Sequence, residues 1–173
     1  MSPELTTDQK GAIVEAAIVL ASMRSGFGVY RPVGEGGRYD LILDVGRRLL
    51  RVQCKWAMKS GDVVLIHCYS TRRTIRGMVN RPYTAAEVEA IVGYCAELDR
   101  CYFVPIELVD GRRLIQLRLG PTRNNQKRHI RWAREYEFER LHFASPGAVA
   151  QLGERCDGIS EAAGSSPAGS TLS

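Results

Sequence analysis

The chain has 173 residues, of which 45% are hydrophobic and 25% are charged, and its formal net charge is +5. This is the composition of an ordinary globular protein, with room for one domain and its core. No apolar run approaches the roughly 18 residues of a membrane span. The start of the chain also lacks the pattern of a signal peptide, so we expect neither a membrane span nor export.

A helix is predicted at the start of the chain. Thr6 or Thr7 can cap it, its apolar positions continue to about Met23, and Gly26 is a suitable stop. The later elements are predicted, in chain order, as a short strand with a glycine-rich loop (29–37), a hairpin (36–56), a third strand (62–70), an arginine-rich loop ending at Pro82 (71–82), two buried strands (88–95 and 101–108), a strand that completes another hairpin (112–119) and a helix (126–141).

Two of these predicted elements, 88–95 and 126–141, are assigned from their apolar residues. A helix is the competing interpretation of residues 88–95, because a short apolar run has no distinctive period. The final helix would turn Ile130, Ala133 and its aromatic residues inward. The order helix, sheet, helix predicts a small α/β (α+β) domain.

The last 28 residues, 146–173, have a different composition. They are rich in Ser, Gly and Pro and poor in large apolar side chains, so we expect a domain at residues 1–145 and a disordered tail at 146–173. The tail also resembles a translated transfer-RNA gene. "AVAQLGER" and "GSSP" correspond to the D-arm and T-arm consensus stretches in the right order. We interpret it as read-through into a neighbouring tRNA gene.

Positive charge is concentrated in two stretches that contain no acid. Residues 70–81 carry four arginines, and residues 118–134 carry six Lys/Arg together with Asn, Gln and Trp. Each could be an ordinary solvated surface, but two such clusters favour a polyanionic partner whose phosphates they neutralise.

The hairpin at 36–56 places polar side chains in strict alternation. A two-residue turn at Gly46-Arg47 pairs Val45 with Arg48 and places Asp40 directly opposite Gln53. The two side chains then share one face and can share a divalent cation, with Lys55 two residues further along that face. A slip by one residue would break this pairing.

Alternation of this kind is usually the solvated face of a half-exposed sheet. Two observations argue against that interpretation here. The opposite face of the second strand is apolar enough for a central strand. In addition, Glu15 is the one charged residue in the apolar stretch 11–21, where a carboxylate is costly unless it is paired or metal-bound, although it could instead face solvent.

Glu15, Asp40 and the Gln53-Cys54-Lys55 stretch resemble the active site of the PD-(D/E)xK nuclease superfamily. The similarity is to its homing endonucleases associated with bacterial group I introns in tRNA genes, which carry Gln in place of the acidic residue of the motif. "YFVPIEL" and "TRNNQ…IRWAREYEF" resemble later segments of that group, so the resemblance covers about residues 5–143. Tyr39 precedes Asp40 where the motif has Pro.

The resemblance implies a restriction-endonuclease-like core, a central mixed β-sheet flanked by helices. It also implies a metal-dependent, sequence-specific double-strand DNA endonuclease. Asp40 would be the main ligand of Mg²⁺, with Gln53 and the Cys54 carbonyl beside it. Glu15 would bind a second ion or a bound water, and Lys55 would position the attacking water.

DNA contacts are expected from the basic stretches. Backbone phosphates would be held by some of these residues, and base edges would be read by Asn and Gln. The candidates are Arg72, Arg73, Arg76, Arg123, Asn124, Asn125, Gln126, Lys127 and Arg128. Because a small nuclease with one site cuts both strands most simply as a symmetric oligomer, we expect a homodimer or homotetramer.

Two other functions remain open from the sequence. One is a structure-selective nuclease such as a Holliday junction resolvase, and the other is a DNA-binding domain without catalysis. The five cysteines form no CxxC pair and are odd in number, which favours a reducing compartment, the cytoplasm of a bacterium or archaeon.

Overall fold

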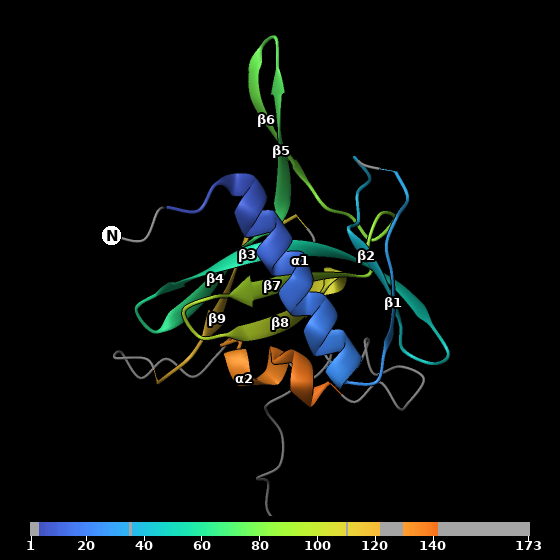
Figure 1. Ribbon diagram of the computed structural model, residues 1–173. Helices are drawn as coiled ribbons and strands as arrows, with labels where there is room; N and C mark the ends of the chain where they lie inside the picture. The colour runs from blue at the N-terminus through green and yellow to red at the C-terminus, as the bar shows by residue number, and fades with distance from the viewer. Residues whose placement is uncertain (1–3, 35, 110, 122–129, 142–173) are drawn as a thin grey trace, which may run out of the picture.

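The structure, a computed structural model, describes residues 4–34, 36–109, 111–121 and 130–141. A mixed β-sheet runs through it, and helix α1 lies across one face of that sheet (Figure 1). The predicted α/β (α+β) class, with a restriction-endonuclease-like central sheet, is confirmed. In the described part of the chain, no helix combines the length and the hydropathy of a membrane span.

Helix α1 (Thr7–Arg24) begins with a capping box. The Thr6 hydroxyl accepts a hydrogen bond from the Gln9 N–H, and the Gln9 side chain accepts one from the Thr6 N–H. The helix buries Val14 and Ile18 against the sheet, and Gly26, with a φ of +77°, follows its end. The predicted first helix is therefore confirmed.

The strands form one large sheet and one separate hairpin. Their bounds are β1 (Gly28–Tyr30), β2 (Leu41–Asp44), β3 (Leu49–Ser60), β4 (Val63–His67), β5 (Tyr69–Thr74), β6 (Gly77–Pro82), β7 (Ala90–Cys95), β8 (Arg100–Pro105) and β9 (Leu114–Arg118). The large sheet has the order β1-β2-β3-β4-β9, with β7 added in parallel to β3 and β8 antiparallel to β7. β5 and β6 pair only with each other.

Strand β3 has three strand partners. β7 pairs with residues 52–57, β2 with 49–52 and β4 with 57–60. Because Val52 and Ala57 each pair with β7 as well, β2 and β4 must lie along the opposite edge of β3. Among the described residues, 53–56 therefore have no strand partner on the edge that β2 and β4 share. This gap in the ladder is the place where the polar side chains of the hairpin gather.

The core is divided by the sheet into two layers. On the α1 side, Leu41 and Val52 pack with residues of the helix and with Phe138. On the other side, Ile66 packs with neighbours that include Tyr136. The Ile66 side chain lies close to the backbone of Gly93, since a Cβ on Gly93 would lie 2.7 Å from the Ile66 Cδ1 atom.

Residues 71–82 are not the predicted loop. They form most of the β5–β6 hairpin, which we call the arm and which projects from the body of the molecule (Figure 1). Its ladder is supported by hydrogen bonds from the Thr71 hydroxyl to the Asn80 side chain and from the Thr74 hydroxyl to the Gly77 carbonyl, each 2.9 Å long. Because most of the arm's side chains are exposed, its sequence has no apolar alternation that would reveal two strands.

The strand pairing predicted for the second half of the chain also differs in part from the observed pairing. The strand predicted at residues 88–95 is present as β7, which begins at Ala90, and β8 follows it. A short 3₁₀ helix, η1 (Ile106–Leu108), then redirects the chain, and β9 pairs with β4 instead of completing a hairpin with β8. The predicted strand 62–70 ends at His67, where the chain leaves the sheet for the arm.

The predicted helix at 126–141 is wrong for its described part, which begins at residue 130. Only α2 (Ala133–Tyr136) and the 3₁₀ helix η2 (Phe138–Arg140) are helical. The Arg118 N–H donates to the Arg131 carbonyl at 2.7 Å, which holds the chain extended beside β9 and prevents a helix there. The inward positions of Ala133 and the aromatic Tyr136 are confirmed.

Candidate active site

The turn between β2 and β3 sets the register of the site. The Val45 N–H donates to the Arg48 carbonyl at 3.0 Å, and Gly46 has a φ of +92°, which a glycine adopts without strain. Leu41 pairs with Val52, as the sequence predicts. Asp40 therefore lies opposite Gln53, at the start of the gap in the ladder.

The Asp40 carboxylate takes the place of a missing strand along this gap. Its Oδ2 atom accepts a hydrogen bond of 2.8 Å from the Cys54 N–H and another from the Gln53 side-chain amide. The same amide nitrogen lies 3.3 Å from the Cys54 carbonyl oxygen. The Asp40 carboxylate, the Gln53 amide and the Cys54 carbonyl are thus gathered at one point.

Burial perturbs both charged groups of the site. It raises the pKa of Asp40, a shift that the Cys54 hydrogen bond opposes and the negative charge of Glu15 increases. Burial also lowers the pKa of Lys55, while the nearby Asp40 opposes this change. An acid and a base shifted toward each other in one place are typical of a site that receives a charged ligand.

A cavity of about 300 Å³ collects the predicted residues Asp40, Gln53 and Lys55. Its other lining residues are Gly36, Gly37, Arg38, Ser70, Thr71, Arg72 and Tyr83. Arg72 was predicted as a DNA contact, and the others were not predicted as site residues. Residues 36–38 adjoin the first strand of the hairpin but show no pattern of a site, and the sequence does not place the base of the arm beside the hairpin. The Tyr83 ring is buried and lies 5.0 Å from the Lys55 Nζ atom.

Glu15 reaches the site from α1 and does not line this cavity. Its carboxylate forms an ion pair of 3.2 Å with Arg31, and a third of its side chain, 32%, is exposed. The pairing explains how a carboxylate is accommodated on such an apolar helix. Its charge is nevertheless close enough to act on Asp40.

The predicted DNA-binding residues fall in two groups. Arg72 and Arg73 are exposed on strand β5, and Arg76 is exposed at the turn of the arm. Arg72 also lines the cavity. Residues 123–128, the other predicted group, lie outside the described residues, as does the predicted tail at 146–173.

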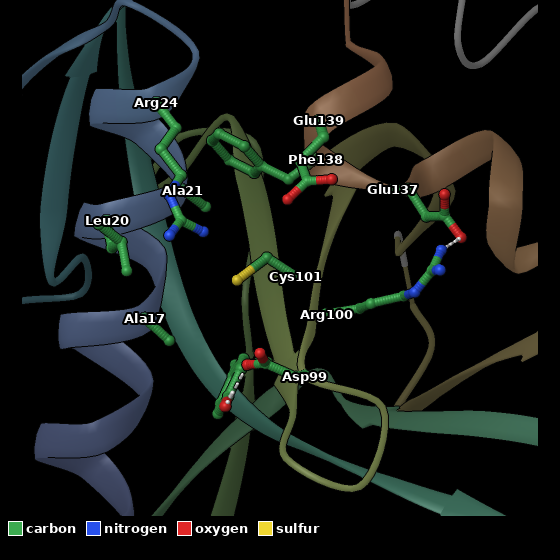
Figure 2. Close-up of a pocket in the computed structure, with 11 residues that line it drawn as sticks. Ala17, Leu20, Ala21, Arg24, Asp99, Arg100, Cys101, Glu137, Phe138 and Glu139 are labelled. Carbon is green, nitrogen blue, oxygen red and sulfur yellow. Dashed lines mark hydrogen bonds and ion pairs between the residues drawn. The ribbon is translucent and has the colours of Figure 1, made fainter.

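A second cavity, of about 150 Å³, lies between α1, β8 and η2 (Figure 2). It contains none of the predicted site residues. Three of the charged groups that line it are already paired, Arg100 with Glu137 and Asp99 with the Tyr94 hydroxyl. The larger cavity is therefore the candidate active site.

Comparison with known proteins agrees with this geometry. The sequence model of a family described as "PD-(D/E)XK endonuclease" matches residues 5–139. The chain belongs to that family. The predicted resemblance and the predicted endonuclease function are confirmed by this match.

A solved structure is similar to this endonuclease over most of its length. It is "The structure of a bacterial homing endonuclease: I-Ssp6803I", with 29% sequence identity and a TM-score of 0.64 over 77% of this chain and 89% of that one. No curated protein sequence matches the chain. The fold and the family thus rest on independent comparisons of sequence and structure.

The donor atoms of the site fit a divalent cation, which nucleases of this family generally use. Carboxylate, amide and backbone carbonyl oxygens are hard ligands of the kind that Mg²⁺ and Ca²⁺ prefer. Within the described residues, no group of three His, Cys, Asp or Glu side chains is placed to hold a metal ion. A cation at this endonuclease's site would therefore depend on the neutral oxygens of Gln53 and Cys54 as well as on Asp40.

Proposed function

We propose that this endonuclease is a homing-type enzyme that cuts both strands of a specific DNA sequence and uses Mg²⁺. The observation that carries the proposal is the gap in the β3 ladder, where Asp40, Gln53 and Lys55 line one cavity. The similarity to a bacterial homing endonuclease supports the biological class. The resemblance of the tail to a translated tRNA gene supports a target in such genes.

The residues of the site would have separate roles in binding the cation. Asp40 would hold the cation together with the Gln53 and Cys54 oxygens, and Glu15 would act from α1 on a second ion or a bound water. When bound, the cation would supply a nucleophilic water near neutral pH and neutralise charge on the scissile phosphate.

Lys55 would orient the attacking water and offset the phosphate charge. Its buried position beside Tyr83 lowers its pKa, so it gives up a proton more readily than an exposed lysine. The Gln53 amide nitrogen now donates to Asp40. To offer its oxygen to a cation, this amide has to turn over.

The arm would bring DNA to the cavity. It is a basic two-stranded ribbon whose Arg72, Arg73 and Arg76 are exposed, and a ribbon of this kind fits the major groove of DNA. Arg72 lies at the cavity and can hold a phosphate next to the scissile one. Residues 123–128 would add further contacts, and a homodimer or homotetramer would present one site to each strand.

The decisive experiment offers the protein its expected target. The full chain and Mg²⁺ are incubated with duplex DNA that contains uninterrupted tRNA genes, and the new ends are mapped. We expect cuts in both strands at one site. Lys55→Ala should bind the same DNA and leave it uncut. If the wild type cut a four-way junction but no duplex, the result would favour a resolvase. If the wild type bound DNA and cut none, the result would favour a DNA-binding domain without catalysis.

A further inference from the structure

The arm has little to hold it in place. It is joined to the sheet at one end and pairs with no other strand of the described chain (Figure 1). An isolated two-stranded hairpin is marginally stable at best. Its direction relative to the cavity must therefore be fixed by contacts at its base, where Tyr69 pairs with Pro82.

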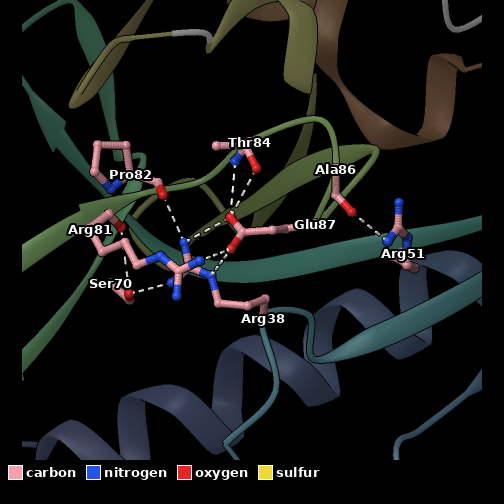
Figure 3. Close-up of polar contacts among 8 residues, drawn as sticks. All are labelled: Arg38, Arg51, Ser70, Arg81, Pro82, Thr84, Ala86 and Glu87. Atoms are coloured by element: carbon pink, nitrogen blue, oxygen red, sulfur yellow. Dashed lines mark hydrogen bonds and ion pairs between the residues drawn. The ribbon is translucent and has the colours of Figure 1, made fainter.

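Arg38 makes those contacts. Its guanidinium donates to the Ser70 hydroxyl at 2.5 Å and to the Pro82 carbonyl at 2.7 Å, so it touches both strands of the arm (Figure 3). It also donates twice to the Glu87 carboxylate, at 3.0 and 3.1 Å. The Arg38 Cζ atom also lies over the Tyr83 ring, 4.2 Å from the centroid of that ring.

The position of Arg38 in the chain connects this cluster to the candidate active site. It lies two residues before Asp40 and lines the same cavity as Asp40 and Lys55. The Tyr83 ring over which it lies also receives the Lys55 ammonium. One side chain thus contacts the arm and an aromatic ring that borders the catalytic lysine.

Glu87 completes the cluster from the segment between the arm and β7. Its carboxylate pairs with Arg81 of β6 at 2.5 Å as well as with Arg38, and accepts from the Thr84 N–H and hydroxyl. The Arg38 and Glu87 side chains are 18% and 13% exposed, so water competes little with their bidentate pairing. The pair is therefore well placed to resist movement of the arm.

We propose that Arg38 is a positioning residue, which fixes the base of the arm so that the arm's arginines meet DNA at the cavity of Asp40 and Lys55. The proposal rests on the proposed function for its DNA partner. Its structural part, that Arg38 orders the arm, does not need DNA. Four of the five guanidinium N–H groups have partners, in a planar arrangement that a lysine ammonium does not reproduce.

Arg51 provides a matched control. It also pairs with an acid, Glu89, at 2.6 Å, and donates to a backbone carbonyl, that of Ala86, but it touches neither strand of the arm (Figure 3). Arg51→Ala removes the same charge as Arg38→Ala. Arg38→Lys keeps the charge, and Glu87→Gln weakens the cluster while preserving its shape.

The first measurement is hydrogen exchange of the full chain without DNA. In Arg38→Ala, we expect amides of residues 69–74 and 77–81 to exchange about tenfold faster, while amides of the β3–β4 hairpin keep their rates. Glu87→Gln should show a smaller increase in the same segments. Arg51→Ala should leave the arm unchanged. Unchanged exchange of the arm in Arg38→Ala would overturn the proposal, as would an equal increase in Arg51→Ala.

The second measurement is the Kd for target DNA in EDTA. It should rise about tenfold in Arg38→Ala and only about twofold in Arg51→Ala, the latter through loss of one charge. Full rescue by Arg38→Lys would show that Arg38 acts as a charge, and would overturn its role as an anchor. If the wild type itself neither bound nor cut DNA, the proposed function would fail, and the exchange experiment would still decide whether Arg38 holds the arm.

Discussion

The carboxylate of Asp40 accepts a hydrogen bond from the backbone N–H of Cys54, 2.8 Å away, at a point where β3 has no strand partner on that edge. A side chain thus takes the place that a strand would occupy. The backbone group that holds Asp40 belongs to the residue between Gln53 and Lys55. Any change in the register of the β2–β3 hairpin would move Asp40 away from all of these groups at once.

Asp40→Asn should abolish cleavage while the protein still folds. The substitution keeps the size of the side chain and an oxygen for the Cys54 N–H, but removes the charge that would hold the cation. We expect the cleavage rate to fall at least about 100-fold, equivalent to ~2.7 kcal/mol. DNA binding in EDTA should be equal or tighter, because one negative charge leaves the cavity. Single-turnover cleavage and a binding titration measure both effects.

Asp44 provides the control for that variant. It lies at the turn, where its carboxylate accepts from the Gly46 N–H at 3.0 Å, a role that an Asn side chain can also fill. Asp44→Asn should retain most of the cleavage rate. An inactive Asp44→Asn beside an active Asp40→Asn would show that the cation is held elsewhere.

Gln53 should respond differently to two substitutions. Gln53→Glu supplies an oxygen in either orientation and adds charge, so cleavage should persist with a lower Mg²⁺ requirement, whereas Gln53→Ala should be nearly inactive. Without a cation, the new carboxylate would repel Asp40, so the Tm of Gln53→Glu should rise more with added Mg²⁺ than the Tm of the wild type. Wild-type rates in both variants would remove Gln53 from the site.

The arginines of the arm should contribute through phosphates. Arg76→Ala is expected to weaken DNA binding to a similar degree for all sequences and to reduce the slope of log Kd against log salt by about one. Equilibrium binding at several salt concentrations measures this slope. A change confined to one base position of the target would instead assign Arg76 to base recognition.

The Glu87 ion pair should make part of the stability dependent on pH. The hydrogen bonds from Arg38 lower the pKa of Glu87 below its ordinary value of 4.5. The unfolded chain therefore takes up the proton first as the pH falls. The contribution of this carboxylate is complete above about pH 4.5 and is lost as the pH falls through the folded pKa.

The difference in free energy of unfolding between wild type and Glu87→Gln should accordingly be largest near neutral pH and shrink in acid. Urea titrations at several pH values measure it. A difference that does not change with pH would mean that Glu87 contributes through its shape alone.

Removal of the tail should change neither folding nor cleavage. Because residues 146–173 resemble a translated tRNA gene, we expect a chain that ends at Ser145 to keep the wild-type Tm and cleavage rate. Thermal unfolding and single-turnover cleavage of the shortened chain test this. Loss of folding on truncation would place the tail within the domain.

The β2–β3 hairpin, which carries Asp40 and Gln53 at the candidate active site, could be predicted because its geometry is local. The turn at Gly46-Arg47 and the two-residue period of the strands determine which side chains face each other, and both can be read from adjacent residues. The other walls of the cavity could not be predicted in this way. Arg38 and Tyr83 meet only because the base of the arm lies beside the hairpin, and no pattern within either segment indicates that contact.

The errors have a common physical cause. The two strands of the arm are held by their own ladder and by Thr71 and Thr74, and their side chains are mostly exposed. Since little burial imposes an apolar pattern on it, the sequence of the arm predicts a loop. Residues 130–132 were predicted as helical because their apolar spacing suits a helix. Pairing of Arg118 with Arg131, distant in sequence, overrides that preference. Neither the ladder of the arm nor the Arg118–Arg131 hydrogen bond produces an apolar period, so sequence periodicity reports neither.

The attachment of the arm at a single end has a consequence for evolution. Residues added in pairs, one to each strand beyond the Ser70–Arg81 pair, would lengthen the ribbon without shifting the register of β3 or disturbing the Arg38 cluster. Its outer half is therefore free to diversify while the hydrolytic centre is held constant. Under the proposed function, a lineage of such enzymes would acquire a new target by exchanging one exposed hairpin, and a protein engineer could graft a different ribbon there.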